Sequence, residues 1–198
     1  MAARLHVGSG TVMLRGYLNV DVPTPRCFLA SERPDLLERY VTDEGQYYRR
    51  HEEYAKLDAF RQGPNQDLYC CDAFGRWDCI PCRDGEAEEL LSRQSFEHLG
   101  LSDAHRALEE TRRVLQSGGM LRLSVPDHES TMRNFIETRE VLLIRHMLGP
   151  RNSPYGFHQM SYTEDSLNKL VCEHGFVPVG QDTNPHIYPS ISLKWRRS

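Results

Sequence analysis

The sequence predicts an open α/β fold, because a glycine-rich turn follows the first apolar stretch and an acidic residue ends the second. The apolar stretch 4–7 runs directly into Gly8 and Gly10, and the second apolar stretch, 17–22, contains Asp21. Glycine at the carboxyl end of a strand lets the backbone approach a ligand closely. An aspartate that ends the neighbouring strand can accept hydrogen bonds from ribose hydroxyls. The pattern therefore predicts a nucleotide-like ligand at one edge of the sheet.

The spacing of the glycines narrows the choice of ligand. A dinucleotide fingerprint needs a third glycine three residues after the second, but that position is Met13 and the next glycine is Gly16. The Gly-Lys-Ser/Thr ending of a phosphate-binding P-loop is absent from the sequence. A Gly-x-Gly turn with a downstream aspartate favours S-adenosylmethionine, which carries a ribose and an amino acid but no phosphate. The alternative is a tight turn that binds nothing.

Size and charge limit the class of protein. A chain of 198 residues is long enough for one domain with a full core. The formal net charge of -4 argues against a general nucleic-acid binder, which normally has a basic face. No apolar run approaches the roughly 20 residues that span a bilayer, and the N-terminal residues do not resemble a signal peptide. We therefore expect a cytoplasmic protein with no membrane span.

The spacing of some cysteines is similar to the ligand spacing of zinc sites. Cys79 and Cys82 have the C-x-x-C spacing of half a tetrahedral site, and the adjacent Cys70 and Cys71 are candidates for the other half. Adjacent residues of a strand point to opposite faces, however, which argues against this pairing. We expect six reduced, mostly buried thiols and no metal, with structural zinc as the alternative.

The segment 23–66 is interpreted as a helical insertion in a single domain that spans residues 1–198. Residues 32–60 are rich in charged and aromatic side chains, and Leu36, Leu37 and Tyr40 stand at helical spacing. The aromatic side chains are expected to pack against the sheet. The alternative is that some of them face a substrate.

The rest of the chain predicts alternating strands and helices. Ser102 and Thr163 precede two amphipathic stretches and are expected to be their N-terminal caps. Strong helical propensity at 87–93 conflicts with the alternation, which favours a strand there. The expected elements, in chain order, are a strand at 67–72, a strand at 90–95, a helix at 102–116, a strand at 120–125, a helix at 130–148, a helix from 163 to Gly175, and strands at 176–179 and 190–195.

The most specific string begins at Ser95-Phe96-Glu97-His98-Leu99. A helix follows, then Gly118-Gly119, and then a strand that ends in Val-Pro-Asp at Asp127. This order resembles class I S-adenosylmethionine-dependent methyltransferases, and most closely a small type 11-like bacterial group. The resemblance covers most of the chain outside 23–66. It implies a Rossmann-like α/β fold with a seven-stranded, mostly parallel sheet, helices on both faces and an antiparallel last strand.

The resemblance also implies roles for single residues, with S-adenosyl-L-methionine as the cofactor. Gly8, Ser9 and Gly10 would pack on its methionine part, and Asp21 would hold the ribose hydroxyls. The remaining expected contacts are Asp72 and Ala73 at the adenine edge and Gln94 and Ser95 near the methionine carboxylate. Many family members carry histidine where Gln94 stands, and Asp72 has a second interpretation as a strand-end turn residue.

Methyl transfer to a hydroxyl requires alignment of the acceptor and removal of its proton. His158 is the first candidate for the base, because it lies in a loop before the last predicted crossover helix and an unperturbed histidine titrates near neutrality. Asp127 and His128, just after a strand, are the next candidates. No metal is expected.

The family is often associated with modification of polysaccharides and glycosides, so a sugar or glycan hydroxyl is the expected acceptor, and nucleic acid is not. The alternative function is a catalytically idle module that binds the cofactor and acts by protein association. The oligomeric state is not predicted.

Overall fold

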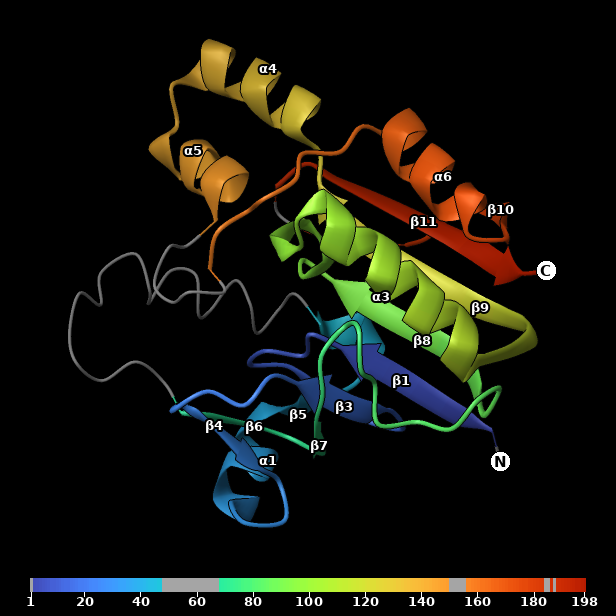
Figure 1. Cartoon of the computed structure of the whole chain (residues 1–198). Helices are drawn as coiled ribbons and strands as arrows, with labels where there is room; N and C mark the ends of the chain where they lie inside the picture. Colours follow the sequence, from blue (N-terminus) through green and yellow to red (C-terminus); the bar gives the residue numbers. More distant parts are fainter. Residues whose placement is uncertain (1, 48–67, 150–155, 184–185, 187) are drawn as a thin grey trace.

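The computed structural model describes residues 2–47, 68–149, 156–183, 186 and 188–198. A seven-stranded sheet dominates it, with strand order β10-β11-β9-β8-β1-β3-β7 (Figure 1). Its strands are β1 (Ala3–Val7), β3 (Leu18–Asp21), β7 (Ala73–Phe74), β8 (Ala87–Arg93), β9 (Leu115–Pro126), β10 (Phe176–Gln181) and β11 (Ser190–Arg197).

Only the last strand runs against the others. β1 pairs in parallel with β3 and β8, and β8 pairs in parallel with β9. β11 is antiparallel to both β9 and β10. The predicted fold class, a Rossmann-like and mostly parallel seven-stranded sheet with a reversed last strand, is confirmed. The strand expected at 90–95 is β8, which begins earlier, so that tertiary pairing overrides its helical propensity.

Two helices cover one face of the sheet, α3 (Leu101–Val114) and α6 (Glu164–Glu173) (Figure 1). Thr163 caps α6 with a complete capping box, as predicted. The cap predicted at Ser102 is wrong. The N-cap of α3 is Gly100, whose extended backbone places its carbonyl to accept from the amide of Ala104 at 2.8 Å. Ser102 therefore lies inside the first turn.

The long helix predicted at 130–148 is two helices, α4 (His128–Thr138) and α5 (Val141–Leu148). Arg139 between them adopts a left-handed backbone with φ 60°, which ends α4. The predicted helix 102–116 also ends early, at Val114. Leu115 takes an extended conformation there and starts β9. α4 and α5 lie beyond the end of the sheet at which β9 finishes (Figure 1).

The segment that was expected to be a helical insertion contains both helix and strand where it is described. α1 (Pro34–Tyr40) and the short helix η1 (Glu44–Gln46) are helical. Around them, β4 (Cys27–Leu29) pairs with β6 (Tyr69–Cys71), and β5 (Val41–Thr42) pairs with β2 (Met13–Leu14). The predicted strand at 67–72 therefore corresponds to β6, outside the main sheet. Residues 48–66 of this segment lie outside the described residues.

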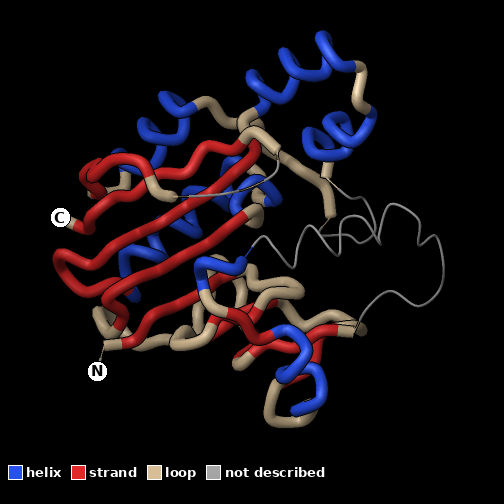
Figure 2. Tube along the Cα trace, turned by 180° about the vertical axis from the view of Figure 1, so that it is seen from behind, coloured by secondary structure: helices blue, strands red, loops and turns tan. Residues whose placement is uncertain are grey.

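The two faces of the sheet differ in chemistry. The apolar core lies between the sheet and the helices α3 and α6, and it includes Leu5, Leu90, Leu121, Leu193 and Trp195 from the strands. The strand residues that alternate with these point to the opposite face, which Figure 2 shows from behind. That face is polar. In the described part of the chain, η1 lies against it through Glu44, which contacts Arg93 of β8 and Arg122 of β9.

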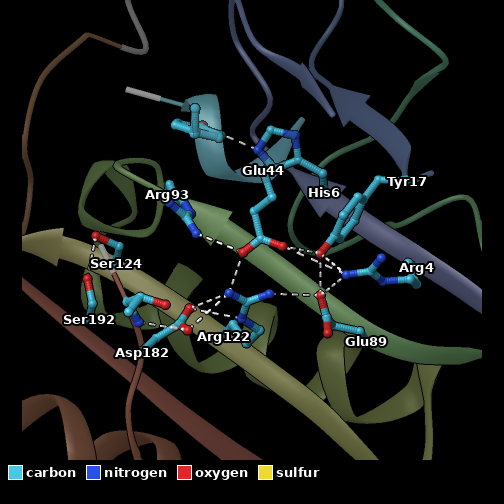
Figure 3. A network of polar contacts seen from close by, with 12 residues as sticks. Arg4, His6, Tyr17, Glu44, Glu89, Arg93, Arg122, Ser124, Asp182 and Ser192 are labelled. Carbon is cyan, nitrogen blue, oxygen red and sulfur yellow. Dashed lines mark hydrogen bonds and ion pairs between the residues drawn. The ribbon is translucent and has the colours of Figure 1, made fainter. Parts of the chain in front are cut away.

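A network of ion pairs crosses the strands β1, β8 and β9 on the polar face (Figure 3). Arg122 pairs with Asp182 at 2.8 Å and with Glu89 at 3.2 Å, and it also contacts Glu44. The hydroxyl of Tyr17 lies between Glu44 and Glu89. Because each buried charge in this network has a partner of opposite sign, the second face can be polar without leaving an isolated charge.

No helix in the described residues is long and apolar enough to span a membrane.

Candidate cofactor site and acceptor-side cluster

The first functional region is the turn that follows β1. Gly8 and Gly10 have positive φ angles of 71° and 54°, a conformation that glycine adopts without strain. The amide of Gly10 donates to Oδ2 of Asp21 at 2.5 Å, and the amide of Val22 donates to Oδ1 of Asp21 at 2.7 Å. The carboxylate at the end of β3 therefore fixes the turn after β1.

Asp21 keeps the capacity to bind a ligand. Each carboxylate oxygen has two lone pairs, so each can accept a further hydrogen bond beside the backbone amide that it already accepts. Burial raises the pKa of Asp21, and the two backbone amides oppose this shift. The geometry fits a carboxylate that accepts hydrogen bonds from the two adjacent hydroxyls of a ribose.

The two glycines of the turn are required for different reasons. A Cβ on Gly8 would lie 1.9 Å from Oγ of Ser95, so the close packing of the chain itself requires glycine there. The hydroxyl of Ser95 in turn accepts from the indole nitrogen of Trp77 at 3.1 Å. A Cβ on Gly10 would meet nothing within 4 Å. Gly10 thus borders open space, into which a ligand can approach the backbone.

Two serine hydroxyls near this turn are buried without a hydrogen-bond partner among the described residues, those of Ser9 and Ser92. Both side chains are nearly inaccessible, at 2 % and 1 % exposure. Buried hydroxyls are normally satisfied, so such groups at a candidate site are consistent with contacts to a bound molecule. Ser92 was not predicted from the sequence, because a serine in the middle of an apolar strand carries no motif.

The remaining cofactor candidates are partly engaged by the protein. Oδ2 of Asp72 accepts from the backbone and side-chain nitrogens of Asn19, both at 2.8 Å, which leaves its other oxygen for a ligand. Ala73 follows as the first residue of β7. Gln94 has a positive φ of 55°, and its side-chain amide donates to the hydroxyls of Ser124 and Ser190 at 3.3 and 3.2 Å. This side chain is therefore anchored on β9 and β11.

The second functional region is a cluster of one carboxylate and three histidines. Glu97 and His98 belong to the short helix η2 (Phe96–His98) after β8. His158 lies beside them, with its Nε2 3.7 Å from Oε1 of Glu97 and its ring centroid 4.7 Å from that of His98. The ring of His128 at the start of α4 is 6.3 Å from that of His158. The structure thus brings together His128 and His158, which were predicted separately, and adds Glu97 and His98.

Burial dominates the electrostatics of this cluster. It raises the pKa of Glu97 to about 8 and lowers the pKa of His158 to about 3, to which the neighbouring His98 also contributes. Burial lowers the pKa of His98 as well, while backbone hydrogen bonds at Phe157 and Gln94 oppose that shift. His158 is therefore neutral at pH 7.

The three candidate catalytic residues all make structural contacts. Asp127 is the N-cap of α4, with Oδ1 accepting from the amide of Ser130 at 3.0 Å and Oδ2 from its hydroxyl at 2.7 Å. His128 and His158 both donate to the carbonyl of Met147, at 2.9 and 3.1 Å. These contacts join the start of α4, the end of α5 and the loop that contains His158.

Comparison with known proteins agrees with the fold and with the predicted resemblance. The family model described as "Methyltransferase domain" matches residues 47–123, which include β8, α3 and most of β9. No curated protein matches the chain.

Three similar solved structures illustrate the likeness. A SAM-dependent methyltransferase from Aquifex aeolicus is 12% identical with a TM-score of 0.50, over 100% of this chain and 82% of that one. The magnesium protoporphyrin IX methyltransferase of Synechocystis PCC 6803, with bound SAH, is 11% identical with a TM-score of 0.51, over 100% and 74%. The 1,6-didemethyltoxoflavin-N1-methyltransferase of Burkholderia thailandensis, with bound S-adenosylhomocysteine, is 13% identical with a TM-score of 0.50, over 100% and 71%. At these identities the likeness establishes the fold, and the family match supports S-adenosylmethionine as its cofactor.

Proposed function

We propose that this chain, whose fold and family match are those of class I S-adenosylmethionine-dependent methyltransferases, methylates a hydroxyl of a sugar, a glycan or another small acceptor. The observation that carries the proposal is the pairing of Gly10 with Asp21 beside open space. It supports binding of a ribose-containing ligand that needs close backbone approach and no phosphate anchor. When bound, S-adenosylmethionine supplies an electrophilic methyl group on a sulfonium.

The proposed contacts follow the strand ends. The turn of Gly8, Ser9 and Gly10 packs on the methionine part, and the free lone pairs of Asp21 accept from the ribose hydroxyls. The free oxygen of Asp72 and the backbone of Ala73 meet the adenine edge. Ser95, which touches the Gly8 turn, lies near the methionine carboxylate, and Gln94 supports that region through its anchored side chain.

The proposed role of the protein in the chemical step is mainly alignment of the acceptor with the methyl group. A histidine with a pKa of about 3 is a weak proton acceptor at neutral pH, so the environment of His158 favours a positioning role over proton abstraction. Asp127 and His128 are proposed to position the acceptor side in the same way, through the start of α4.

The acceptor is the least constrained part of the proposal. Two of the similar structures are named as methyltransferases of magnesium protoporphyrin IX and of 1,6-didemethyltoxoflavin, so one fold serves unrelated acceptors. A hydroxyl acceptor rests on the resemblance noted above, and the net charge of -4 favours a small molecule over nucleic acid. A cytoplasmic location is proposed because six cysteines without a recognisable disulfide framework are typical of a reducing compartment.

The test has two stages. Isothermal titration should show binding of S-adenosylmethionine and S-adenosylhomocysteine with dissociation constants in the micromolar range, about -8 kcal/mol. Binding of NAD in place of both would contradict the proposal. A mass-spectrometric screen for a 14 Da gain, run on sugars, glycans and nucleotide sugars with unrelated amines and carboxylic acids for comparison, should then identify the acceptor. Binding without transfer to any acceptor would favour the alternative, a catalytically idle interaction module.

A further inference from the structure

One group of side chains in the described residues has the composition of a metal site. Glu97, His98 and His158 each offer one ligand atom, and these atoms all lie within 4.8 Å of one another. Two of the residues are adjacent in η2, and the third comes from a loop some sixty positions later in the chain. The fold, and not local sequence, brings the three together.

The carboxylate of Glu97 is the most unusual member of the group. The side chain has 0% exposure, and neither oxygen has a hydrogen-bond partner among the described residues. Burying an unpaired carboxylate is costly, and proteins normally offset the cost with a hydrogen bond, an ion pair or a metal. Nε2 of His158 lies 3.7 Å from Oε1 of Glu97, which is beyond hydrogen-bond distance.

The two histidines are oriented to present lone pairs. Nδ1 of His158 lies 3.1 Å from the carbonyl of Met147, and Nδ1 of His98 lies 2.9 Å from the carbonyl of Phe157. A carbonyl oxygen only accepts, so Nδ1 must carry the proton in both rings. In the neutral imidazole of His158 the other nitrogen, Nε2, then has a free lone pair, while His98 also has a backbone hydrogen bond at Gln94 that it would give up on binding a metal. Metal-binding histidines are held in this way, with the second ring nitrogen donating to a backbone carbonyl or carboxylate.

We propose that Glu97, His98 and His158 form a binding site for a first-row divalent transition metal such as zinc. Two imidazoles and one carboxylate are a known zinc ligand set, and they also suit neighbouring metals of the series. Metal–ligand bonds of 2.0–2.2 Å correspond to ligand atoms about 3.4 Å apart in a tetrahedral site. The ligand atoms lie within 4.8 Å of one another, so an approach of at most about 1.4 Å would complete the site.

A third imidazole, that of His128, lies next to this group. His128 donates from Nε2 to the same Met147 carbonyl as His158, and its Nδ1 is buried without a hydrogen-bond partner among the described residues. A metal held by η2 and the His158 loop would therefore also stabilise the start of α4. It would cross-link the three segments that surround the proposed acceptor region. This inference does not depend on the proposed methyl transfer.

The experiment uses the full chain after treatment with a chelator and dialysis. Zinc is titrated in competition with a chromophoric chelator, and cobalt(II) is added separately to record its visible spectrum. The wild type should bind one zinc ion per chain, and cobalt should give the d–d bands of a low-symmetry site without a sulfur charge-transfer band. The variants Glu97→Gln and His98→Asn should each lower zinc affinity by more than about tenfold, since even outer-sphere changes at metal sites cost 10- to 100-fold.

Two controls separate this site from others. His105→Gln removes a histidine whose Nδ1 lies 2.8 Å from Nε2 of His174 at a second histidine pair, so it reports adventitious surface binding. The double variant Cys79→Ser/Cys82→Ser removes the C-x-x-C pair. Both control proteins should bind zinc as the wild type does.

Several results would overturn the proposal. Absence of stoichiometric zinc binding to the folded wild type would do so, and would favour a protonated, uncharged Glu97 instead. Loss of binding in either control, or a sulfur charge-transfer band with cobalt, would move the metal elsewhere. If Glu97→Gln fails to fold, the half-buried His98 provides the same comparison in His98→Asn. Cofactor titration of the metal-free protein shows separately whether the proposed methyltransferase site is intact.

Discussion

The amide of Gly10 donates to Oδ2 of Asp21 at 2.5 Å, and this bond joins the turn after β1 to the end of β3. The two features that the sequence offers as separate signals are therefore one structural unit. A residue that holds the turn can also hold the ligand that the turn admits, because its oxygens keep unused lone pairs. Mutation of Asp21 is expected to affect both properties, so the two must be measured separately.

Asp21→Ala should weaken binding of S-adenosylmethionine by on the order of 1–3 kcal/mol, the range for hydrogen bonds that involve a charged group. Isothermal titration gives the affinity, and urea unfolding of the ligand-free protein gives the stability. Asp21→Asn is the matched control, since it keeps the shape and one acceptor oxygen, and it should lose less affinity than alanine. Equal affinity of the wild type and Asp21→Ala would remove this residue from the site.

The two glycines of the turn should respond differently to alanine. At Gly8 the new methyl group would meet Ser95, so Gly8→Ala should destabilise the fold by about 1–3 kcal/mol, as overpacking does. At Gly10 the methyl group would enter open space, so the cost should be limited to the left-handed backbone, about 1 kcal/mol. Gly10→Ala should nevertheless reduce cofactor affinity by about tenfold or more, equivalent to roughly 1.4 kcal/mol.

Stability curves in urea and cofactor titrations of both proteins test this contrast. A Gly10→Ala protein that binds S-adenosylmethionine as tightly as the wild type would show that the open space beside Gly10 is not where the ligand approaches.

The sequence predicts the sheet well because the number and direction of its strands follow from the family resemblance, and the position of single strands follows from local pattern. The alternation of Arg4, Leu5, His6 and Val7 places apolar residues on one face of β1 and polar residues on the other. The polar second face of the sheet was therefore readable from single strands, although its ion-pair partners were not. Glu44 and Asp182 come from segments whose placement only tertiary structure gives.

The helix boundaries and the histidine cluster were harder to predict. Arg139 has a left-handed backbone and divides the stretch 130–148 into two helices. Arginine rarely adopts this conformation, so the sequence does not predict the break. The Glu97-His98 pair was recognised only as part of a family motif, because its burial and its proximity to His158 depend on the packing of η2 against a distant loop. The sequence shows which residue types are present, but it does not show which side-chain atoms lie close enough together to bind one metal ion.

The C-x-x-C pair, Cys79 and Cys82, should contribute little to stability. Cys79 is exposed and Cys82 is half-buried, so Cys79→Ser/Cys82→Ser should change the free energy of unfolding by less than about 1 kcal/mol and leave cofactor affinity unchanged. The buried pair Cys27 and Cys71, whose sulfurs lie 3.6 Å apart, is the matched control. A serine hydroxyl buried there without a partner should cost about 1–3 kcal/mol.

Elemental analysis of the purified wild type and of the C-x-x-C variant completes this test. Zinc that is present in the wild type and is lost together with the fold in Cys79→Ser/Cys82→Ser would establish a structural zinc site at these cysteines, which we do not expect.

His6 should make the protein less stable in mild acid. Its ring is fully buried on the polar face of the sheet, with Nδ1 3.0 Å from Oδ1 of Asn19 and Nε2 3.3 Å from the hydroxyl of Tyr47. Burial lowers the pKa of His6 from 6.5 to about 4, and the charge of Arg93 adds to this, against the effects of Asn19 and Glu44. The folded protein therefore binds this proton more weakly than the unfolded chain.

The direction in which stability changes with pH follows from that difference in proton affinity. The contribution of neutral His6 to stability is complete above pH 6.5 and is lost as the pH falls from 6.5 to about 4. A shift of this size corresponds to roughly 3 kcal/mol at the acid end, at 1.36 kcal/mol per pH unit. Urea unfolding at several pH values between 7.5 and 4 should show the free energy of the wild type falling by about that much more than that of His6→Gln.

The comparison between variants is needed because burial lowers the pKa of other groups as well, including His158, and these groups also destabilise the fold as the pH falls. Subtracting the two curves cancels their contributions as long as the sites are independent. Parallel curves for the wild type and His6→Gln would mean that the pKa of His6 is the same in the folded and unfolded chain, in conflict with its burial beside Arg93.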